Sequence, residues 1–436
     1  MAINAFFLIY LRSITARIED LPESFVDSTR QTMGDSLFAA FVEGLAQEPP
    51  VSIRLNRAKY KGEPDGGERV PWSACGYYLP ERPVFTFDPL LHAGCYYVQE
   101  ASSMFIERAL RQYVTDPVEM LDMCAAPGGK SLAAISSLPE GSWVLSNEPI
   151  RPRASILAEN VSKWGSPRMA VISNYPKEIS KSKMKFDVIL CDVPCSGEGM
   201  FRKDPHAIKE WSEQNVEKCR LLQREIVTEA WKCLRPGGIL IYSTCTFNTH
   251  ENEENVRWIS EEYDAEILPV DICEEWHVTG SLLAEFHMPV YRFIPGVARG
   301  EGIFMAVMRK QGEWKAQRNP SLDKLPSALH RLELQRLDEG CPTVDIDYPT
   351  AIAYLRREAI RLPDDAPRGI VTITYRDIPL GQAKNLGNRA NNLYPKEWRI
   401  KSTHVPEGET IVIRNEELGI RNEELGMRNE ELGIRN

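Results

Sequence analysis

The chain has 436 residues, of which 43% are hydrophobic and 26% are charged. This length permits two or three domains, because a single hydrophobic core rarely serves more than about 250–300 residues. Ten cysteines in so long a chain, with no CxxC pair, exclude the disulfide framework of small secreted domains and a structural zinc site. The net charge of −10 argues against nucleic acid as a partner unless a local basic patch exists. We therefore expect reduced thiols, a cytoplasmic protein and no bound metal.

Residues 1–19 form an N-terminal extension of unassigned role, and residues 20–112 form a mixed α+β region. The apolar run 5–11 falls well short of the roughly 20 residues that span a bilayer, so we expect no membrane role. Within the mixed region, helical periodicity is found at 36–47 and strand-like alternation at 51–56.

From residue 118 onward, apolar runs of strand length alternate with amphipathic helical segments. This alternation is typical of a parallel, doubly wound α/β sheet, which we place in a domain over 113–310. The predicted strands are 118–123, 143–148, 169–173, 186–191, 238–243, 265–268 and 303–309. The predicted helices are 130–137, 151–164, 215–234 and 251–263.

Three segments follow the predicted sheet. Residues 311–344 are polar and irregular, so we expect a linker with some helix. Residues 345–408 predict a small α+β unit with a helix at 350–361, a strand at 370–375 and a loop-rich basic stretch after it. The tail, 409–436, repeats Arg-Asn-Glu-Glu-Leu-Gly three times. Because glycine disfavours a helix, we expect the tail to be disordered.

A glycine-containing loop follows the first strand of the sheet and opens the first helix. The sequence from Cys124 to Lys130 is Cys-Ala-Ala-Pro-Gly-Gly-Lys, whose small residues let the backbone approach a ligand at a helix N-terminus. A P-loop is disfavoured, because that motif needs glycine at Cys124. Glu148 ends the second strand, the position from which an acid binds ribose hydroxyls in Rossmann-type sites. A nucleoside-bearing cofactor is therefore favoured over a simple turn and helix cap.

Two cysteines follow the next pair of strands. Cys195 lies in Asp-Val-Pro-Cys and Cys245 in Ser-Thr-Cys-Thr, each directly after an apolar run. Either cysteine alone could be a buried structural thiol. The carboxyl ends of neighbouring strands, however, converge on one crevice in an open α/β sheet. We therefore predict that both thiols face the same pocket.

A basic stretch near the C-terminus could bind nucleic acid despite the negative net charge of the whole chain. Residues 376–401 contain six Lys and Arg residues against Asp377 and Glu397, a net charge of +4. Cations for phosphates and aromatic rings for base stacking are what RNA loops require; the alternative is a solvated face with a buried Trp. The candidate RNA-binding residues are Lys384, Asn388, Arg389, Tyr394, Trp398 and Arg399.

These motifs together resemble the Nol/Nop/Sun family of S-adenosylmethionine-dependent RNA 5-methylcytosine methyltransferases, over about residues 20–310. Arg202-Lys-Asp-Pro and the run Lys384–Pro395 are similar to the subgroup that acts on small-subunit ribosomal RNA. The resemblance implies a class I (Rossmann-like) methyltransferase sheet of seven strands, an RNA-binding N-terminal α+β region and a C-terminal PUA-like RNA-binding domain. It also implies ribosomal RNA or the small ribosomal subunit as the partner, and we expect a monomer.

The resemblance assigns roles to the site residues. Carbon 5 of cytosine is a poor nucleophile, so a thiolate first adds at carbon 6. By resemblance Cys245 is that thiolate and Cys195 assists its release, while Asp192 hydrogen-bonds the ring and Lys130 lies near the reaction centre. Arg153 is a further candidate cofactor contact, with a solvated helix charge as the alternative. The implied S-adenosylmethionine contacts are Cys124, Ala125, Ala126, Pro127, Gly128, Gly129, Lys130, Glu148, Asn174 and Asp192.

Three other functions stay open at this point. The chain could modify tRNA or another RNA in the same way. A DNA cytosine methyltransferase would use the Pro-Cys thiol for attack, but the second thiol and the C-terminal unit count against it. A ribosome-assembly factor could bind RNA and cofactor without turnover, which the intact pair of cysteines disfavours.

Overall fold

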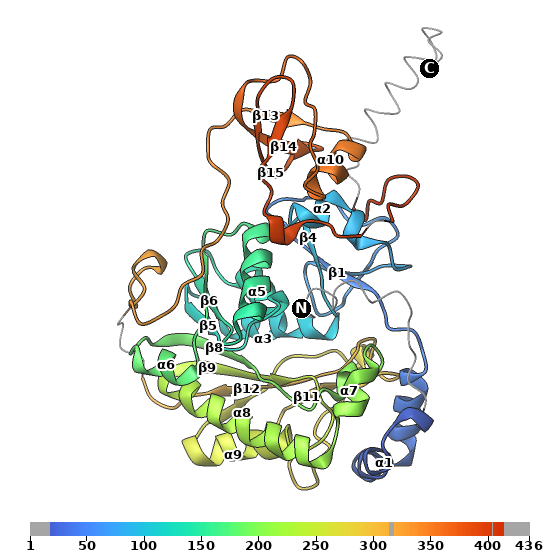
Figure 1. Cartoon of the computed structure of the whole chain (residues 1–436). Coiled ribbons are helices and arrows are strands. Elements are labelled where there is room, and N and C mark those ends of the chain that lie inside the picture. Colours follow the sequence, from blue (N-terminus) through green and yellow to red (C-terminus); the bar gives the residue numbers. More distant parts are fainter. Residues whose placement is uncertain (1–17, 314–317, 403, 414–436) are drawn as a thin grey trace.

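The computed structural model describes residues 18–313, 318–402 and 404–413, and it contains three units that are each built on a sheet (Figure 1). The apolar run at 5–11 and the three repeats of the tail lie outside the described residues. Within those described ranges, no helix is long and apolar enough to cross a membrane.

The central sheet confirms the predicted class I arrangement. Its strands run in the order β10-β12-β9-β8-β5-β6-β7, with β11 paired to β12. Strands β5 to β9 are parallel, and β12 is antiparallel to β9. The strands are β5 (Glu119–Asp122), β6 (Trp143–Asn147), β7 (Met169–Ile172), β8 (Phe186–Asp192), β9 (Leu234–Thr244), β10 (Glu266–Leu268), β11 (Tyr291–Phe293) and β12 (Ile303–Arg309). The three-residue strand β11 was not predicted, because it is too short to show an alternating pattern.

Helices cover both faces of this sheet, which is why its parallel strands are continuous apolar runs. Helices α3, α4 and α5 pack on one face, and α6, α8 and α9 pack on the other. Gly165 ends α5 in the left-handed conformation, with φ of 79°, which glycine adopts without a steric penalty. The helices are α3 (Ile106–Tyr113), α4 (Gly129–Ser137), α5 (Arg151–Trp164), α6 (Pro176–Lys181), α7 (Pro205–Glu210), α8 (Glu213–Cys233) and α9 (Glu253–Tyr263).

The N-terminal unit combines a long helix with a small sheet. Helix α1 spans Glu23–Leu45 with a kink at Gly34, so it begins well before the predicted helix at 36–47. Its aromatic side chains pack beside two loops of the central unit, residues 193–204 after β8 (the Cys195 loop) and residues 245–252 after β9 (the Cys245 loop). The ring centroids of Phe25 and Phe201 lie 5.1 Å apart, and those of Phe41 and Phe247 lie 5.0 Å apart. The sheet has the order β2-β3-β1-β4. Its elements are β1 (Ser52–Leu55), β2 (Glu68–Arg69), β3 (Gly76–Tyr78), α2 (Pro89–His92) and β4 (Tyr96–Val98).

The C-terminal unit is more regular than predicted. The stretch expected to be loop-rich forms β15, which pairs antiparallel with β14, and the helix ends at Leu355. This unit shares a hydrophobic core with the N-terminal sheet, and Tyr348 Oη donates a hydrogen bond to the Phe87 carbonyl oxygen at 3.0 Å. Figure 1 shows the two units side by side. The elements are β13 (Thr343–Asp345), α10 (Tyr348–Leu355), β14 (Gly369–Tyr375), β15 (Ile378–Asn385) and β16 (Ala390–Asn392).

Within the stretch 311–344, which was predicted as a linker, residues 330–332 run along the β7 edge of the central sheet. The Leu332 amide donates to the Val171 carbonyl and the Ser173 amide donates to the His330 carbonyl, both at 2.9 Å. Leu329 and Leu332 are buried. These contacts extend the β7 edge by a short antiparallel segment. Among the residues of this stretch that the structure describes, the expected helix is a 3₁₀ turn, Leu322–Lys324.

A buried ion pair joins the N-terminal sheet to helix α3. Arg54 on β1 and Glu107 on α3 have side chains 0% and 1% exposed, with Nη1 and Oε2 2.8 Å apart. Glu107 also accepts hydrogen bonds from Ser73 Oγ at 2.7 Å and from the Ala74 amide at 3.1 Å. Burial alone would raise the pKa of Glu107, but the Arg54 charge and these hydrogen bonds hold the pKa below its usual value.

We predict that Glu107→Ala destabilises the protein severely, because it leaves the buried Arg54 guanidinium without its counter-charge. Breaking a buried pair in this way costs about 3–5 kcal/mol of unfolding free energy, measurable by urea denaturation. Asp364→Ala is the control: its ion pair with Arg361 is solvent-exposed, and such pairs contribute about 0–1 kcal/mol. Equal effects of the two substitutions would contradict the assignment.

Candidate active site

The two predicted thiols lie together, as expected from the strand order. Cys195 follows β8 and Cys245 follows β9, and these strands are parallel neighbours with Asp192 opposite Ser243. The sulfur atoms are 3.2 Å apart, and the Cys245 amide approaches Cys195 Sγ at 3.3 Å. Both side chains are partly exposed. The structure therefore brings the two thiols together, and the pocket that they are expected to share stays a prediction.

The environment of the pair distinguishes the two sulfurs. The hydrogen bond to Cys245, burial and the charge of Cys245 all raise the pKa of Cys195 well above the usual thiol value. Cys195 therefore keeps its proton at neutral pH, and its S–H group can donate toward Cys245. Because the thiolate rather than the thiol is the nucleophile, the protonated Cys195 is suited to donating a hydrogen bond rather than to attack.

An ion pair stands beside the thiols. Lys130 Nζ lies 2.8 Å from Asp192 Oδ2, and Ser243 Oγ donates to Asp192 Oδ1 at 2.7 Å. Burial works to lower the pKa of Lys130, but the charges of Asp192 and Cys245 outweigh it and raise the pKa above the usual lysine value. The ammonium group is thus retained, and its charge acts on Cys245.

The glycine loop and Glu148 lie at the carboxyl ends of β5 and β6. Gly128 has φ of 123° and precedes α4, so the loop presents backbone groups at a helix N-terminus. Glu148 is 1% exposed, and its Oε1 accepts a hydrogen bond from the Ile150 amide at 2.9 Å. Arg153 is exposed and contacts Glu148 Oε2 at 3.4 Å and the Ala126 carbonyl at 3.1 Å. A backbone cradle next to a carboxylate is a donor set that fits a nucleoside cofactor.

Asn174 is placed differently from the expectation of an adenine contact. It is 1% exposed, and its side-chain oxygen accepts a hydrogen bond from the His330 amide at 2.8 Å. Its side-chain nitrogen donates to Glu178 Oε2 and to the Ala328 carbonyl, both at 3.3 Å. Its amide group is therefore engaged by the chain itself, and it fastens the 328–332 segment to the sheet.

The candidate RNA-binding residues divide by exposure. Lys384, Asn388, Arg389 and Arg399 are exposed. Tyr394 is 2% exposed and belongs to the core shared with the N-terminal unit, so the expectation that its ring stacks on RNA bases was wrong. Burying that ring against Tyr354 stabilises the unit itself.

Trp398, the remaining candidate, is half-buried, with Lys163 Nζ 5.5 Å from its ring centroid.

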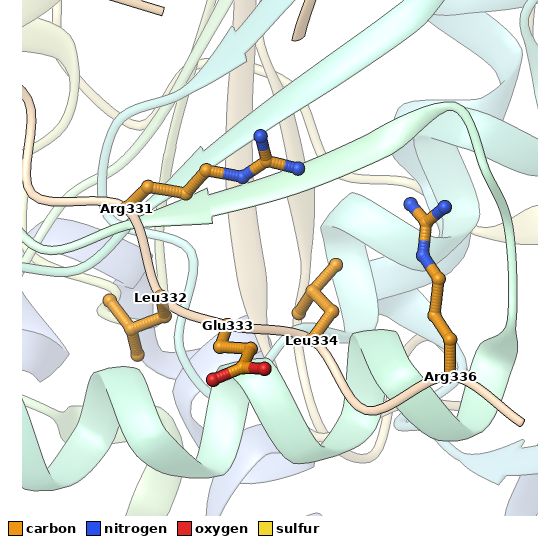
Figure 2. Close-up of a pocket in the computed structure, with 5 residues that line it drawn as sticks. All are labelled: Arg331, Leu332, Glu333, Leu334 and Arg336. Atoms are coloured by element: carbon orange, nitrogen blue, oxygen red, sulfur yellow. The ribbon is translucent and has the colours of Figure 1, made fainter. Parts of the chain in front are cut away.

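A hollow of about 340 Å³ lies along residues 331–336, and none of the predicted site residues lines it. Figure 2 shows the guanidinium groups of Arg331 and Arg336 on one side of this segment. A second hollow, of about 230 Å³, opens between α1, the start of α8 and residues 247–250. Neither Cys195 nor Cys245 lines the second hollow.

Several polar residues at the site were not predicted. Asp122, at the end of β5, is fully buried, and burial is the main cause that raises its pKa to about 7. Glu198 on the Cys195 loop and Glu251 on the Cys245 loop are both buried. The run Glu-Asn-Glu-Glu-Asn from Glu251 onward is visible in the sequence, yet nothing in it indicates that Glu251 faces inward.

Comparison with known proteins gives the class and then the family. The sheet order, the glycine loop and the acid after β6 define a class I methyltransferase. Residues 109–309 match the model of the family "16S rRNA methyltransferase RsmB/F", residues 21–101 match "N-terminal domain of 16S rRNA methyltransferase RsmF", and residues 341–400 match "Methyltransferase RsmF PUA domain". The chain belongs to the RsmB/F methyltransferase family.

Curated relatives and solved structures agree with this family. "Ribosomal RNA small subunit methyltransferase F" of Enterobacter sp. (strain 638) is 29% identical over 86% of this chain and 95% of its own length. The proteins of that name from Pectobacterium atrosepticum and Salmonella heidelberg are 33% and 34% identical over 67% and 69% of this chain. Those two alignments span only 63% and 65% of the relatives' own length.

Solved structures show the same fold. A methyltransferase homolog from Pyrococcus horikoshii has 25% identity and a TM-score of 0.53 over 66% of this chain and all of its own. NSun6 from Pyrococcus horikoshii, solved with SFG, has 19% identity and a TM-score of 0.57 over 68% of this chain and all of its own.

We predict that Glu251 makes stability pH-dependent. Burial, and then the charge of Glu198, raise its pKa from the ordinary 4.5 to about 7. Between these values the folded chain binds more protons than the unfolded chain, so the free energy of unfolding falls as the pH rises through this window. Glu251→Gln should remove this part of the slope, on the order of 3 kcal/mol. Urea denaturation at about pH 5 and about pH 8 measures it.

Glu254→Gln is the matched control for this slope. Glu254 lies on the same segment but pairs with the exposed His250 at 3.0 Å. The variant should keep the contribution of Glu251. Identical slopes for the wild type and Glu251→Gln would show that Glu251 does not take up a proton on folding.

Proposed function

We propose that the protein is an S-adenosylmethionine-dependent RNA cytosine-C5 methyltransferase that acts as a monomer on small-subunit ribosomal RNA. The observation that carries this proposal is the pair of thiols, 3.2 Å apart, beside the Lys130–Asp192 ion pair. One thiol is enough for a structural role, whereas methylation of cytosine uses one thiol for addition to the ring and a second thiol to assist release of the product. The names of the curated relatives support ribosomal RNA as the substrate.

The chemistry begins with the target cytosine flipped into the pocket. The Cys245 thiolate adds to carbon 6 of the ring, forming the C–S bond and making carbon 5 nucleophilic. Asp192 would accept hydrogen bonds from the amino group and from N3 when that nitrogen is protonated. Lys130 holds Asp192 in place and keeps a positive charge near Cys245.

Release of the product reverses the addition. S-adenosylmethionine, when bound, supplies the electrophilic methyl group for carbon 5. A water molecule or another base must then take the proton from carbon 5, so that the electron pair of that C–H bond re-forms the C5–C6 double bond and expels the Cys245 thiolate. Cys195 is placed to assist this step, because its S–H group, with the sulfur 3.2 Å from Cys245, can donate a hydrogen bond to the departing thiolate.

The proposal also assigns the contacts to the cofactor and to RNA. The backbone of Cys124–Lys130 and the Glu148 carboxylate would hold S-adenosylmethionine, with Asp192 and Arg153 nearby. The exposed cations Lys384, Arg389 and Arg399 and the side chain of Asn388 would contact RNA from the C-terminal unit, with phosphates as the partners of the cations.

We predict different outcomes for the two cysteine variants. Cys245→Ala should abolish methyl transfer, because no thiolate can add at carbon 6. Cys195→Ala should accumulate a covalent protein–RNA adduct, because addition still occurs and release is blocked. Denaturing gels with small-subunit RNA and S-adenosylmethionine detect the adduct as a slowly migrating band. Absence of that band in Cys195→Ala would refute this division of roles.

We further predict that Glu148→Ala weakens cofactor binding. Loss of hydrogen bonds between a charged group and the ligand costs about 1.5–3 kcal/mol, equivalent to a rise in Kd of about 10- to 100-fold. Isothermal titration calorimetry with S-adenosylmethionine measures this change without RNA. Glu159→Ala, which removes a partly exposed carboxylate paired with Lys163 on α5, is the control and should leave Kd unchanged.

A further inference from the structure

The two cysteine loops are held together by buried carboxylates that the proposed chemistry does not use. Glu198 lies in the 3₁₀ turn Glu198–Met200, three residues after Cys195, and is 1% exposed. Its Oε2 accepts hydrogen bonds from the amides of Phe247 and Asn248, at 2.6 and 3.0 Å. A carboxylate on the Cys195 loop thus binds the backbone of the Cys245 loop.

Glu251 makes the reciprocal contact from the other side. It follows Cys245 by six residues and is 0% exposed. Its Oε2 accepts from the Ser196 amide at 3.0 Å and from Gln223 Nε2 at 2.7 Å. Gln223, on α8, also donates to the Pro194 carbonyl at 2.9 Å. Each cysteine loop therefore supplies a carboxylate to the backbone of the other.

Asn248 joins the two carboxylates. Its side-chain nitrogen lies 2.9 Å from Glu198 Oε1 and 2.8 Å from Glu251 Oε1, and its oxygen accepts from the Glu251 amide at 2.9 Å. An amide nitrogen has two hydrogens, one for each carboxylate. Hydrogen bonds to charged groups are about twice as strong as neutral ones, so this side chain offsets the unfavourable proximity of the two buried carboxyl groups.

The loops are also in direct backbone contact at the thiols. The Gly199 amide donates to the Cys245 carbonyl at 2.8 Å, and a Cβ at Gly199 would lie 2.8 Å from that same oxygen. Only glycine permits this approach. Together with the carboxylates, this contact sets the positions of Cys195 and Cys245 relative to each other.

We propose that Glu198, Asn248 and Glu251 form a positioning brace that fixes the separation of the two thiols, so that the brace is needed for release of the product more than for attack. This proposal rests on the proposed function. Attack requires Cys245 together with Lys130 and Asp192, which are held by β8, β9 and α4. Release also requires Cys195 at its present distance, and the brace, the Gly199 contact and the contact between the Ser196 and Thr246 hydroxyl groups at 2.9 Å hold the two loops together.

Two brace variants test the proposal in the full-length chain with both cysteines intact. Glu251→Gln replaces one acceptor with a donor that faces other donors, and Asn248→Ala removes the link between the carboxylates. Both should accumulate the covalent RNA adduct on denaturing gels, about ten-fold above the wild type, because a shift of about 1 Å can cost about 100-fold in rate. A general loss of stability would lower all activity without accumulating the adduct.

Glu253→Gln is the matched control. Glu253 is also buried, two residues from Glu251, but it pairs with Arg292 at 2.8 Å and contacts neither cysteine loop through its side chain in the described hydrogen bonds. This variant should lose stability yet show no adduct above the wild type. Melting temperatures of all variants identify those that are folded; if Glu251→Gln is unfolded, Asn248→Ala decides.

A second readout needs neither RNA nor cofactor. Diamide takes two electrons and two protons from a pair of thiols to form one S–S bond, so the rate of Cys195–Cys245 cross-linking reports how often the sulfurs meet. Peptide mass spectrometry follows this cross-link. The brace variants should cross-link about ten-fold more slowly than the wild type and Glu253→Gln. Unchanged cross-linking together with no adduct in either variant would overturn the brace.

Failure of the brace and failure of the proposed function give different results. If the wild type transfers no methyl group to RNA and Cys195→Ala forms no adduct, the proposed function fails, whatever the cross-linking rates are. If Cys195→Ala forms the adduct while the brace variants neither accumulate it nor cross-link more slowly, only the brace fails.

Discussion

The site depends on one constraint of backbone geometry: two parallel, hydrogen-bonded strands have their carboxyl ends at the same edge of the sheet. Strands β8 and β9 are in register up to Asp192 and Ser243, so the residues after them emerge side by side. The Asp192–Ser243 hydrogen bond at 2.7 Å continues the pairing through side chains. Every later feature, from the 3.2 Å sulfur separation to the Lys130 contact, requires this common edge.

Buried ion pairs connect the parts of the molecule around that edge. Arg54 and Glu107 join the N-terminal sheet to α3. Arg202, which the sequence marks only as a family motif, is 4% exposed and donates to the carbonyls of Gly44 and Gly300, each at 2.8 Å. It therefore fastens the stretch after Cys195 to α1. Because an unpaired buried charge is costly, such pairs tolerate few alternative arrangements and favour a single position for each part.

The sequence predicted the features that long apolar runs indicate. The parallel strands are apolar on both faces, so their existence and order of appearance could be predicted, and two polar turns after neighbouring strands were enough to bring the thiols together. Contacts made by single side chains could not be predicted. Asn174 bonds to the chain more than 150 residues away at His330, and Tyr394 is buried by a surface of the N-terminal unit. Strand β15 contains Pro and Gly, which obscured its pattern.

The 328–332 segment has a consequence for how firmly the C-terminal unit is held on the rest of the molecule. It continues the β7 edge, where unpaired backbone groups would otherwise invite association with other chains, and it leads directly to a C-terminal unit that shares a core with the N-terminal sheet. The C-terminal unit is thus anchored at both of its ends rather than hanging from a free tether. The positions of its exposed cations relative to the two thiols are therefore set by packed contacts and not by a flexible linker.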